Sequence, residues 1–152
     1  MMKENIRQSE KIANGLNTLL SDYQIYYQNL RALHWLVKGE KFFILHEKYE
    51  EWYDEAADTI DEIAERILMI DGIPMHTYDD FMKESEIEPV KNIRDGKQGI
   101  IIVMNNSNQL LERMRIVLKA ADESGDEGTI DLLSGLIGST EKRIWMLRSF
   151  MD

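Results

Sequence analysis

Residues 33–46, with the sequence LHWLVKGEKFFILH, contain the break that decides the fold. The break, Lys38-Gly39-Glu40, separates two long helical patterns, since glycine commonly ends a helix. A short connection predicts an antiparallel helix pair, in which residues equidistant from the turn face each other. His34 and His46 each lie six residues from Glu40. We therefore expect the two imidazoles to meet across this hairpin.

Apolar residues recur at helical spacing in four segments, which span residues 12–37, 49–70, 100–121 and 130–147. Residues typical of helix ends separate them: Gly39, then Asp71-Gly72-Ile73-Pro74, then Ser124-Gly125-Asp126. The first and second segments, and the third and fourth, have short connections. The sequence therefore predicts two antiparallel helical hairpins.

Residues 73–92 are long enough to cross the bundle and join the two hairpins. Within this stretch, Thr77 is a suitable N-cap for a short helix over residues 77–82. We predict an all-α four-helix bundle with one long crossover between its second and third helices. The chain of 152 residues is expected to form a single domain, residues 1–152.

Composition excludes several classes of function. The chain has no cysteine, which removes disulfides, zinc-thiolate sites and thiol catalysis. Its formal net charge of −10 argues against a general nucleic-acid binder, which needs clustered lysine and arginine. No apolar run is long enough to span a membrane, and the N-terminus lacks the apolar core of a signal peptide. We therefore expect a cytoplasmic protein with no membrane partner.

Two sets of metal-binding side chains lie on the second predicted helix. Glu50 lies four residues past His46, on the same face, and Asp61 and Glu65 repeat that spacing fifteen residues after His46. At 1.5 Å per residue the two sets are roughly 22 Å apart, too far for one metal centre. Either they form two unrelated sites, or a second copy of the chain brings them together. Imidazole with carboxylate suits iron, zinc, manganese or cobalt.

Simpler interpretations of these residues also fit the pattern. His34 lies on an apolar stripe, where a core histidine with a hydrogen-bond partner is common. The acids of the second helix fit a solvated acidic face. No Asp or Glu is followed three residues later by His, so a di-iron centre within one chain, with its Glu-x-x-His motifs, is not expected. Two arrangements are therefore left open: one site shared between two chains, or two separate half-sites.

Several motifs occur together along the chain: His34-Trp35, residues 39–48, Asp61-Glu62-Ile63-Ala64-Glu65-Arg66, Gly72-Ile73-Pro74 and Arg143-Ile144-Trp145-Met146-Leu147. This combination resembles the Dps-type mini-ferritins, of the ferritin-like superfamily, over essentially the whole chain. The resemblance implies that the protein forms a hollow dodecamer. It also implies a ferroxidase activity, in which Fe²⁺ is oxidised at intersubunit sites and the ferric mineral is stored inside. It also implies that hydrogen peroxide is the preferred oxidant, which gives protection against peroxide stress. Iron is the only cofactor implied, with no organic cofactor.

The resemblance assigns roles to the candidate residues. His34 and His46 match metal ligands from one subunit, and Asp61 and Glu65 match ligands from its twofold mate. Many members have aspartate at the position of Glu50. The glutamate keeps the carboxylate and adds a methylene. Whether Glu50 binds the metal directly or through water is left open.

Two further acids match residues that line the iron-entry pores of the family. Asp126 and Asp131 lie at the start of the fourth predicted helix. Acids in this place also fit a simple favourable interaction with the helix dipole. The pattern therefore supports an entry-pore role and a purely local role equally.

DNA binding is not expected of this chain. Family members that bind DNA often carry a mobile lysine-rich tail. Here the N-terminal segment has only Lys3, Arg7 and Lys11, interleaved with Glu4 and Glu10. The alternative function is a DNA-compacting stress protein whose metal site is secondary.

Overall fold

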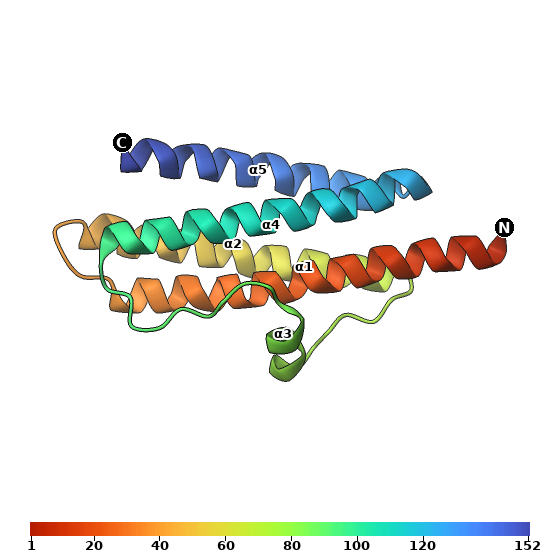
Figure 1. Ribbon diagram of the computed structural model, residues 1–152, viewed down its shortest axis with the longest axis horizontal. Coiled ribbons are helices and arrows are strands. Elements are labelled where there is room, and N and C mark those ends of the chain that lie inside the picture. Colours follow the sequence, from red (N-terminus) through yellow and green to blue (C-terminus); the bar gives the residue numbers. More distant parts are fainter.

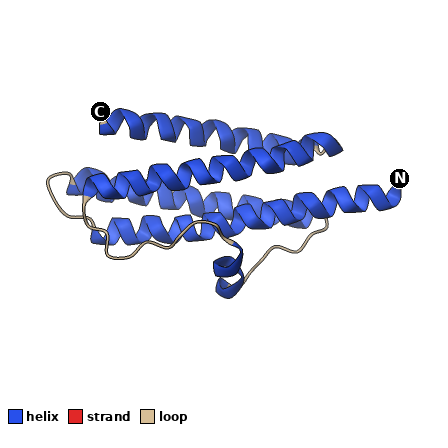
Figure 2. Ribbon diagram, in the orientation of Figure 1, coloured by secondary structure: helices blue, strands red, loops and turns tan.

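The computed structural model describes residues 1–152 and contains helices and connections, with no strand (Figure 2). The helices are α1 (Met2–Leu36), α2 (Phe42–Met69), α3 (Tyr78–Glu84), α4 (Gly96–Ser124) and α5 (Glu127–Met151). The pairs α1/α2 and α4/α5 are antiparallel, and the crossover that carries α3 runs beside α1 (Figure 1). The predicted four-helix bundle with a short crossover helix is confirmed. None of the helices has the length and apolar character needed to cross a membrane.

Helix α1 is the most enclosed element of the bundle. It contacts α2, α4 and α3, and sixteen of its residues are buried, whereas α2 buries five. Leu16, Leu19 and Leu30 are completely enclosed. Burial of each such side chain contributes about 1.5–3 kcal/mol. The core is therefore built around α1, and the other helices are placed relative to it.

The helices begin earlier than their apolar stripes. Helix α1 begins at Met2 and α2 at Phe42, although the stripes start at residues 12 and 49. Residues 2–7 of α1 are exposed, so no apolar spacing marks them. This segment holds lysine, glutamate, arginine and asparagine, and most of these residue types favour helix without burial. Hydrophobic periodicity reports only the buried part of a helix.

The crossover is attached to α1 by buried polar side chains that the apolar stripes did not indicate. Asn17 donates from Nδ2 to the Ile73 carbonyl at 3.0 Å and accepts from the Met75 backbone N–H at 2.7 Å. Because a buried backbone group without a partner is costly, these bonds allow an irregular segment to lie against the bundle.

Asp22 makes a similar attachment one turn further along α1. Its Oδ1 accepts from the Ser85 hydroxyl and from the Glu86 backbone N–H, both at 2.9 Å. Burial raises the pKa of the Asp22 carboxyl, although the hydrogen bonds from Glu86 and Ser85 oppose the rise. The carboxylate thus holds the residues that follow α3.

The connections have the residues that their geometry requires. Gly39 has a φ of 113°, in the region that glycine adopts without strain, and the Lys38 backbone N–H donates to the Arg94 carbonyl at 3.0 Å. The α1–α2 turn is therefore paired with the end of the crossover. Thr77 caps α3 by accepting from the Asp80 backbone N–H, as predicted.

Asn29 offers a test of these polar attachments. Its amide donates to the Glu88 carbonyl at 3.0 Å and to Asn106 at 3.1 Å, and its oxygen accepts from the Val90 backbone N–H at 2.9 Å. We expect Asn29→Ala to lower the free energy of unfolding by about 2–4 kcal/mol, because it leaves buried polar groups unpaired. Denaturant unfolding at a fixed protein concentration measures this loss.

Asn105→Ala is the matched control for that measurement. Asn105 is an exposed asparagine of α4 whose side chain makes no hydrogen bond, so its removal should change stability by less than about 0.5 kcal/mol. Equal losses in the two variants would contradict the role given to Asn29.

Candidate metal centre

The two imidazoles that the sequence placed on opposite sides of the turn are in direct contact. The rings of His34 and His46 are stacked, with centroids 3.7 Å apart and an interplanar angle of 13°. His34 is 8% exposed, and His46 is half-buried. Phe42 stacks on the ring of His46 at 4.9 Å. The prediction that these histidines meet across the hairpin is confirmed.

Reciprocal hydrogen bonds show that Nδ1 of each ring carries a hydrogen. His34 donates from Nδ1 to the His46 carbonyl at 2.5 Å, and His46 donates from Nδ1 to the His34 carbonyl at 2.8 Å. A carbonyl oxygen only accepts, so each Nδ1 carries a hydrogen and each neutral ring has a free lone pair on Nε2. Neither Nε2 atom has a partner in the chain, and neither is buried. This is the arrangement of a metal-binding histidine oriented by a backbone carbonyl.

Glu50 lies beside the histidines on α2 and has one partner in the chain. The Tyr53 hydroxyl donates to Oε1 of Glu50 at 3.2 Å. The pKa of Tyr53 is raised, mainly by loss of hydration and secondly by the charge of Glu50. Tyr53 therefore stays protonated and can donate. The Tyr53 ring lies edge-on to His34, with centroids 5.4 Å apart.

Asp61 and Glu65 lie on the same continuous helix, α2, and both are exposed. Neither carboxylate makes a hydrogen bond or an ion pair within the chain. The fifteen residues from His46 to Asp61 amount to four helical turns plus about 60°, so both sets of candidate ligands lie on one side of α2. No three His, Asp or Glu side chains of the chain come close enough to hold one metal ion.

Asp126 has an unexpected set of partners. Its carboxylate accepts from Arg66 Nη2 at 2.7 Å and from the Thr129 backbone N–H at 3.2 Å, so it caps α5. Partial burial acts to raise the pKa of Asp126, but hydrogen bonds from Thr129 and the charge of Arg66 outweigh it, and the pKa lies below its usual value. Asp131, the second predicted pore acid, is exposed and unpaired.

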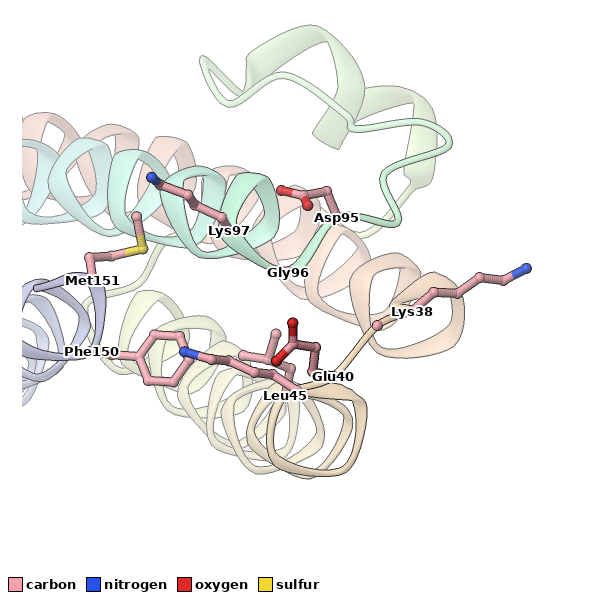
Figure 3. Close-up of a pocket in the computed structure, with 10 residues that line it drawn as sticks. Lys38, Glu40, Leu45, Asp95, Gly96, Lys97, Phe150 and Met151 are labelled. Carbon is pink, nitrogen blue, oxygen red and sulfur yellow. The ribbon is translucent and has the colours of Figure 1, made fainter.

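The open pocket at the end of the bundle contains none of the predicted ligands. It has a volume of about 490 Å³ and lies between the α1–α2 turn, the start of α4 and the end of α5 (Figure 3). Lys38 points away from it, and Lys41 Nζ lies 4.3 Å from the centroid of the Phe150 ring (Figure 3). It offers no histidine. The imidazole pair lies elsewhere, on the face shared by α1 and α2.

Comparison with known proteins identifies the family to which this fold belongs. A ferritin-like domain model matches residues 13–152. A DNA protection during starvation protein of Porphyromonas gingivalis is 37% identical over 144 residues, which cover 95% of this chain and 91% of that protein. The chain belongs to the Dps-type mini-ferritins.

Solved structures and a further relative extend this result. The crystal structure of a Dps protein from Vibrio cholerae, described as a member of a superfamily of ferritin-like diiron-carboxylate proteins, has a TM-score of 0.95 and 40% identity. It covers 96% of this Dps-type mini-ferritin and 92% of the Vibrio chain. General stress protein 20U of Bacillus subtilis is 33% identical, over 94% of this chain and 99% of that protein.

Two residues of the site region were missed by sequence analysis. Tyr53 was counted only as a member of an apolar stripe, although its hydroxyl reaches the acid three residues before it. Arg66 was noted only as part of a motif, yet it joins α2 to the start of α5 through Asp126 and Thr129. The spacing of three residues between Glu50 and Tyr53 was a local signal for their contact. Arg66 and Asp126 are about 60 positions apart, so their contact had no such signal.

The partners of Asp126 predict how the stability of this mini-ferritin depends on pH. A carboxyl group with a lowered pKa adds stability that is present above its unfolded pKa, about 4, and is lost as pH falls through the folded value. We expect Asp126→Asn, which keeps a capping side chain, to cost about 1 kcal/mol at pH 7. The difference from the original chain should shrink as pH falls below the unfolded pKa and through the lower folded pKa of Asp126.

Denaturant unfolding at pH 7 and at successively lower pH values through the acid range measures this difference. Asp131→Asn is the control, because it removes an unpaired carboxylate from the same helix. A loss for Asp126→Asn that stays constant over the whole pH series would contradict the ion pair with Arg66.

Proposed function

We propose that this Dps-type mini-ferritin is a ferroxidase and iron-storage protein whose reaction sites are shared between two subunits. The observation that carries the proposal is the stacked pair of His34 and His46, with two free Nε2 atoms and too few ligands in its own chain. Imidazole with carboxylate suits iron. Its diiron-carboxylate relative of known structure supports the same metal.

Asp61 and Glu65 supply the missing ligands in this proposal. They form a second incomplete set, roughly 22 Å along α2 from the first. In a twofold contact each subunit presents the same surface to the other, so the histidines of one chain meet the acids of its mate. The contact produces two complete sites per dimer. Glu50 adds a carboxylate to the histidine side of each site.

The proposed reaction oxidises two Fe²⁺ ions with one hydrogen peroxide. Each Fe²⁺ gives one electron, the O–O bond breaks, and uptake of two protons releases two waters and leaves two Fe³⁺. No hydroxyl radical is released, because both electrons are delivered at one site. Anionic and imidazole ligands favour the Fe³⁺ product. Ligand sets with few protein groups leave positions open for the oxidant.

Storage needs an enclosed assembly, and we propose the dodecamer that the family resemblance implies. Iron entry is assigned to the acids at the start of α5. Asp131 is exposed and unpaired, so it is free to attract Fe²⁺. Asp126 contributes negative charge there, but its carboxylate is also held by Arg66 and Thr129.

A DNA-compacting role is the second candidate, and one observation favours it. Lys3, Arg7 and Lys11 are spaced four residues apart, so they share one face of the exposed start of α1. Glu4 and Glu10 beside them, and a net charge of −10, oppose binding to phosphates. We propose that the chain does not condense DNA directly. Retardation of a plasmid by the iron-free protein at physiological salt would favour the second candidate.

Complementation between variants tests the shared site. We expect His34→Ala and Asp61→Ala each to slow iron oxidation at least about tenfold, because each removes a ligand. When the two variants are co-assembled, half of the twofold pairs are mixed, and one site in each mixed pair is intact. The rate of ferric absorbance should recover to about a quarter of the original value.

His76→Ala and Glu62→Ala are the controls for this experiment. His76 is an exposed histidine of the crossover, and Glu62 is an exposed acid beside Asp61. Both should retain the original rate. If co-assembly of His34→Ala with Asp61→Ala restores nothing, the sites are not shared between subunits.

Stoichiometry tests the reaction class. Anaerobic titration should show about two Fe²⁺ bound per chain, since each twofold pair forms two sites and each site holds two ions. Addition of half as much peroxide as iron should oxidise all of the Fe²⁺. Ferric absorbance measures the oxidation, and a radical-trapping dye detects any hydroxyl radical. Oxidation that needs one peroxide per iron, with release of radicals, would rule out the paired reaction.

A further inference from the structure

Glu50 is an exposed residue whose carboxylate accepts one hydrogen bond in the chain, from Tyr53. The two residues lie three positions apart on α2, so they are neighbours on the helix surface. The Tyr53 hydroxyl donates to Oε1 at 3.2 Å, and Oε2 makes no hydrogen bond in the chain. Glutamate has three side-chain torsions, which makes a free exposed carboxylate poorly oriented. A donor on one oxygen restricts it.

Tyr53 is itself held by α1. Its ring lies edge-on to His34, at 5.4 Å between centroids and 81°, and edge-on to Tyr27, at 5.9 Å and 85°. Edge-to-face packing of this kind favours one ring orientation. One side chain therefore touches an imidazole of the site through its ring and the carboxylate of the site through its hydroxyl.

We propose that Tyr53 is a positioning residue of the metal site, which orients Glu50 beside the histidine pair. This inference rests on the proposed function. With Oε1 engaged, Oε2 remains the oxygen available to a metal ion or to its bound water. Groups that orient a ligand through a hydrogen bond commonly change metal affinity by 10–100-fold. Tyr53 acts through Glu50 and does not bind the metal.

Anaerobic titration with Co²⁺ tests this role without turnover, because imidazole and carboxylate also bind cobalt. Tyr53→Phe keeps the ring and removes the hydroxyl, and we expect the Co²⁺ dissociation constant to rise about tenfold. The visible Co²⁺ spectrum should change with it. Tyr27→Phe is the matched control, because the Tyr27 hydroxyl makes no hydrogen bond in the chain and its ring packs on the same cluster.

A double-mutant cycle separates positioning from packing. In a Glu50→Ala background, Tyr53→Phe should have no further effect on Co²⁺ affinity, since the hydroxyl then has nothing to orient. An equal loss in both backgrounds would overturn the inference. A phenolate-to-iron charge-transfer band in the ferric protein that disappears in Tyr53→Phe would also overturn it, because Tyr53 would then be a ligand.

The outcomes also distinguish this inference from the proposed function. If Tyr53→Phe binds Co²⁺ as tightly as the original chain, while His34→Ala does not bind it, only the role of Tyr53 falls. If the original chain and His34→Ala bind Co²⁺ equally, the histidine site itself is wrong, and the inference falls with it.

Discussion

The enclosure of α1 on three sides is the constraint on which the rest of the structure depends. Its apolar face packs against α2 and α4, and its buried polar residues form hydrogen bonds with the crossover. An irregular segment of this length can lie on a bundle only where its backbone groups find partners. Asn17, Asp22 and Asn29 supply them. The fold is thus specified as much by these polar contacts as by the apolar core.

The same helix carries His34 close to its C-terminal end, where backbone carbonyls lack helical partners. One such carbonyl, that of His34, accepts from His46, and the His46 carbonyl accepts in return. The hydrogen bonds that join the two helices near the turn therefore also orient the two imidazole rings. Backbone groups set the tautomer of each ring, so the two Nε2 atoms are ready for a metal before any metal arrives. In the proposed function, this preorganisation lets the rings bind Fe²⁺ without a change of tautomer.

Within one chain the proposed metal site is incomplete, because no three candidate ligands come together. One end of α2 carries His46 and Glu50, beside His34 of α1, and the other end carries Asp61 and Glu65. A straight helix keeps the two sets apart. A second copy related by a twofold axis would join the ends without any change of fold. In the proposed function, assembly and chemistry therefore depend on each other, because only associated subunits have complete sites.

Features of this protein that depend on local spacing could be predicted from the order of its residues. Helical periodicity and Gly39 specified the bundle, equal distances from Glu40 paired His34 with His46, and Thr77 marked the start of α3. Three features could be seen only in the folded chain: the ion pair of Asp126 with Arg66, the attachment of the crossover to α1, and the tautomers of the histidines. The physical reason is that these contacts join groups far apart in the chain or depend on backbone atoms. Neither leaves a periodic signal in the order of side chains.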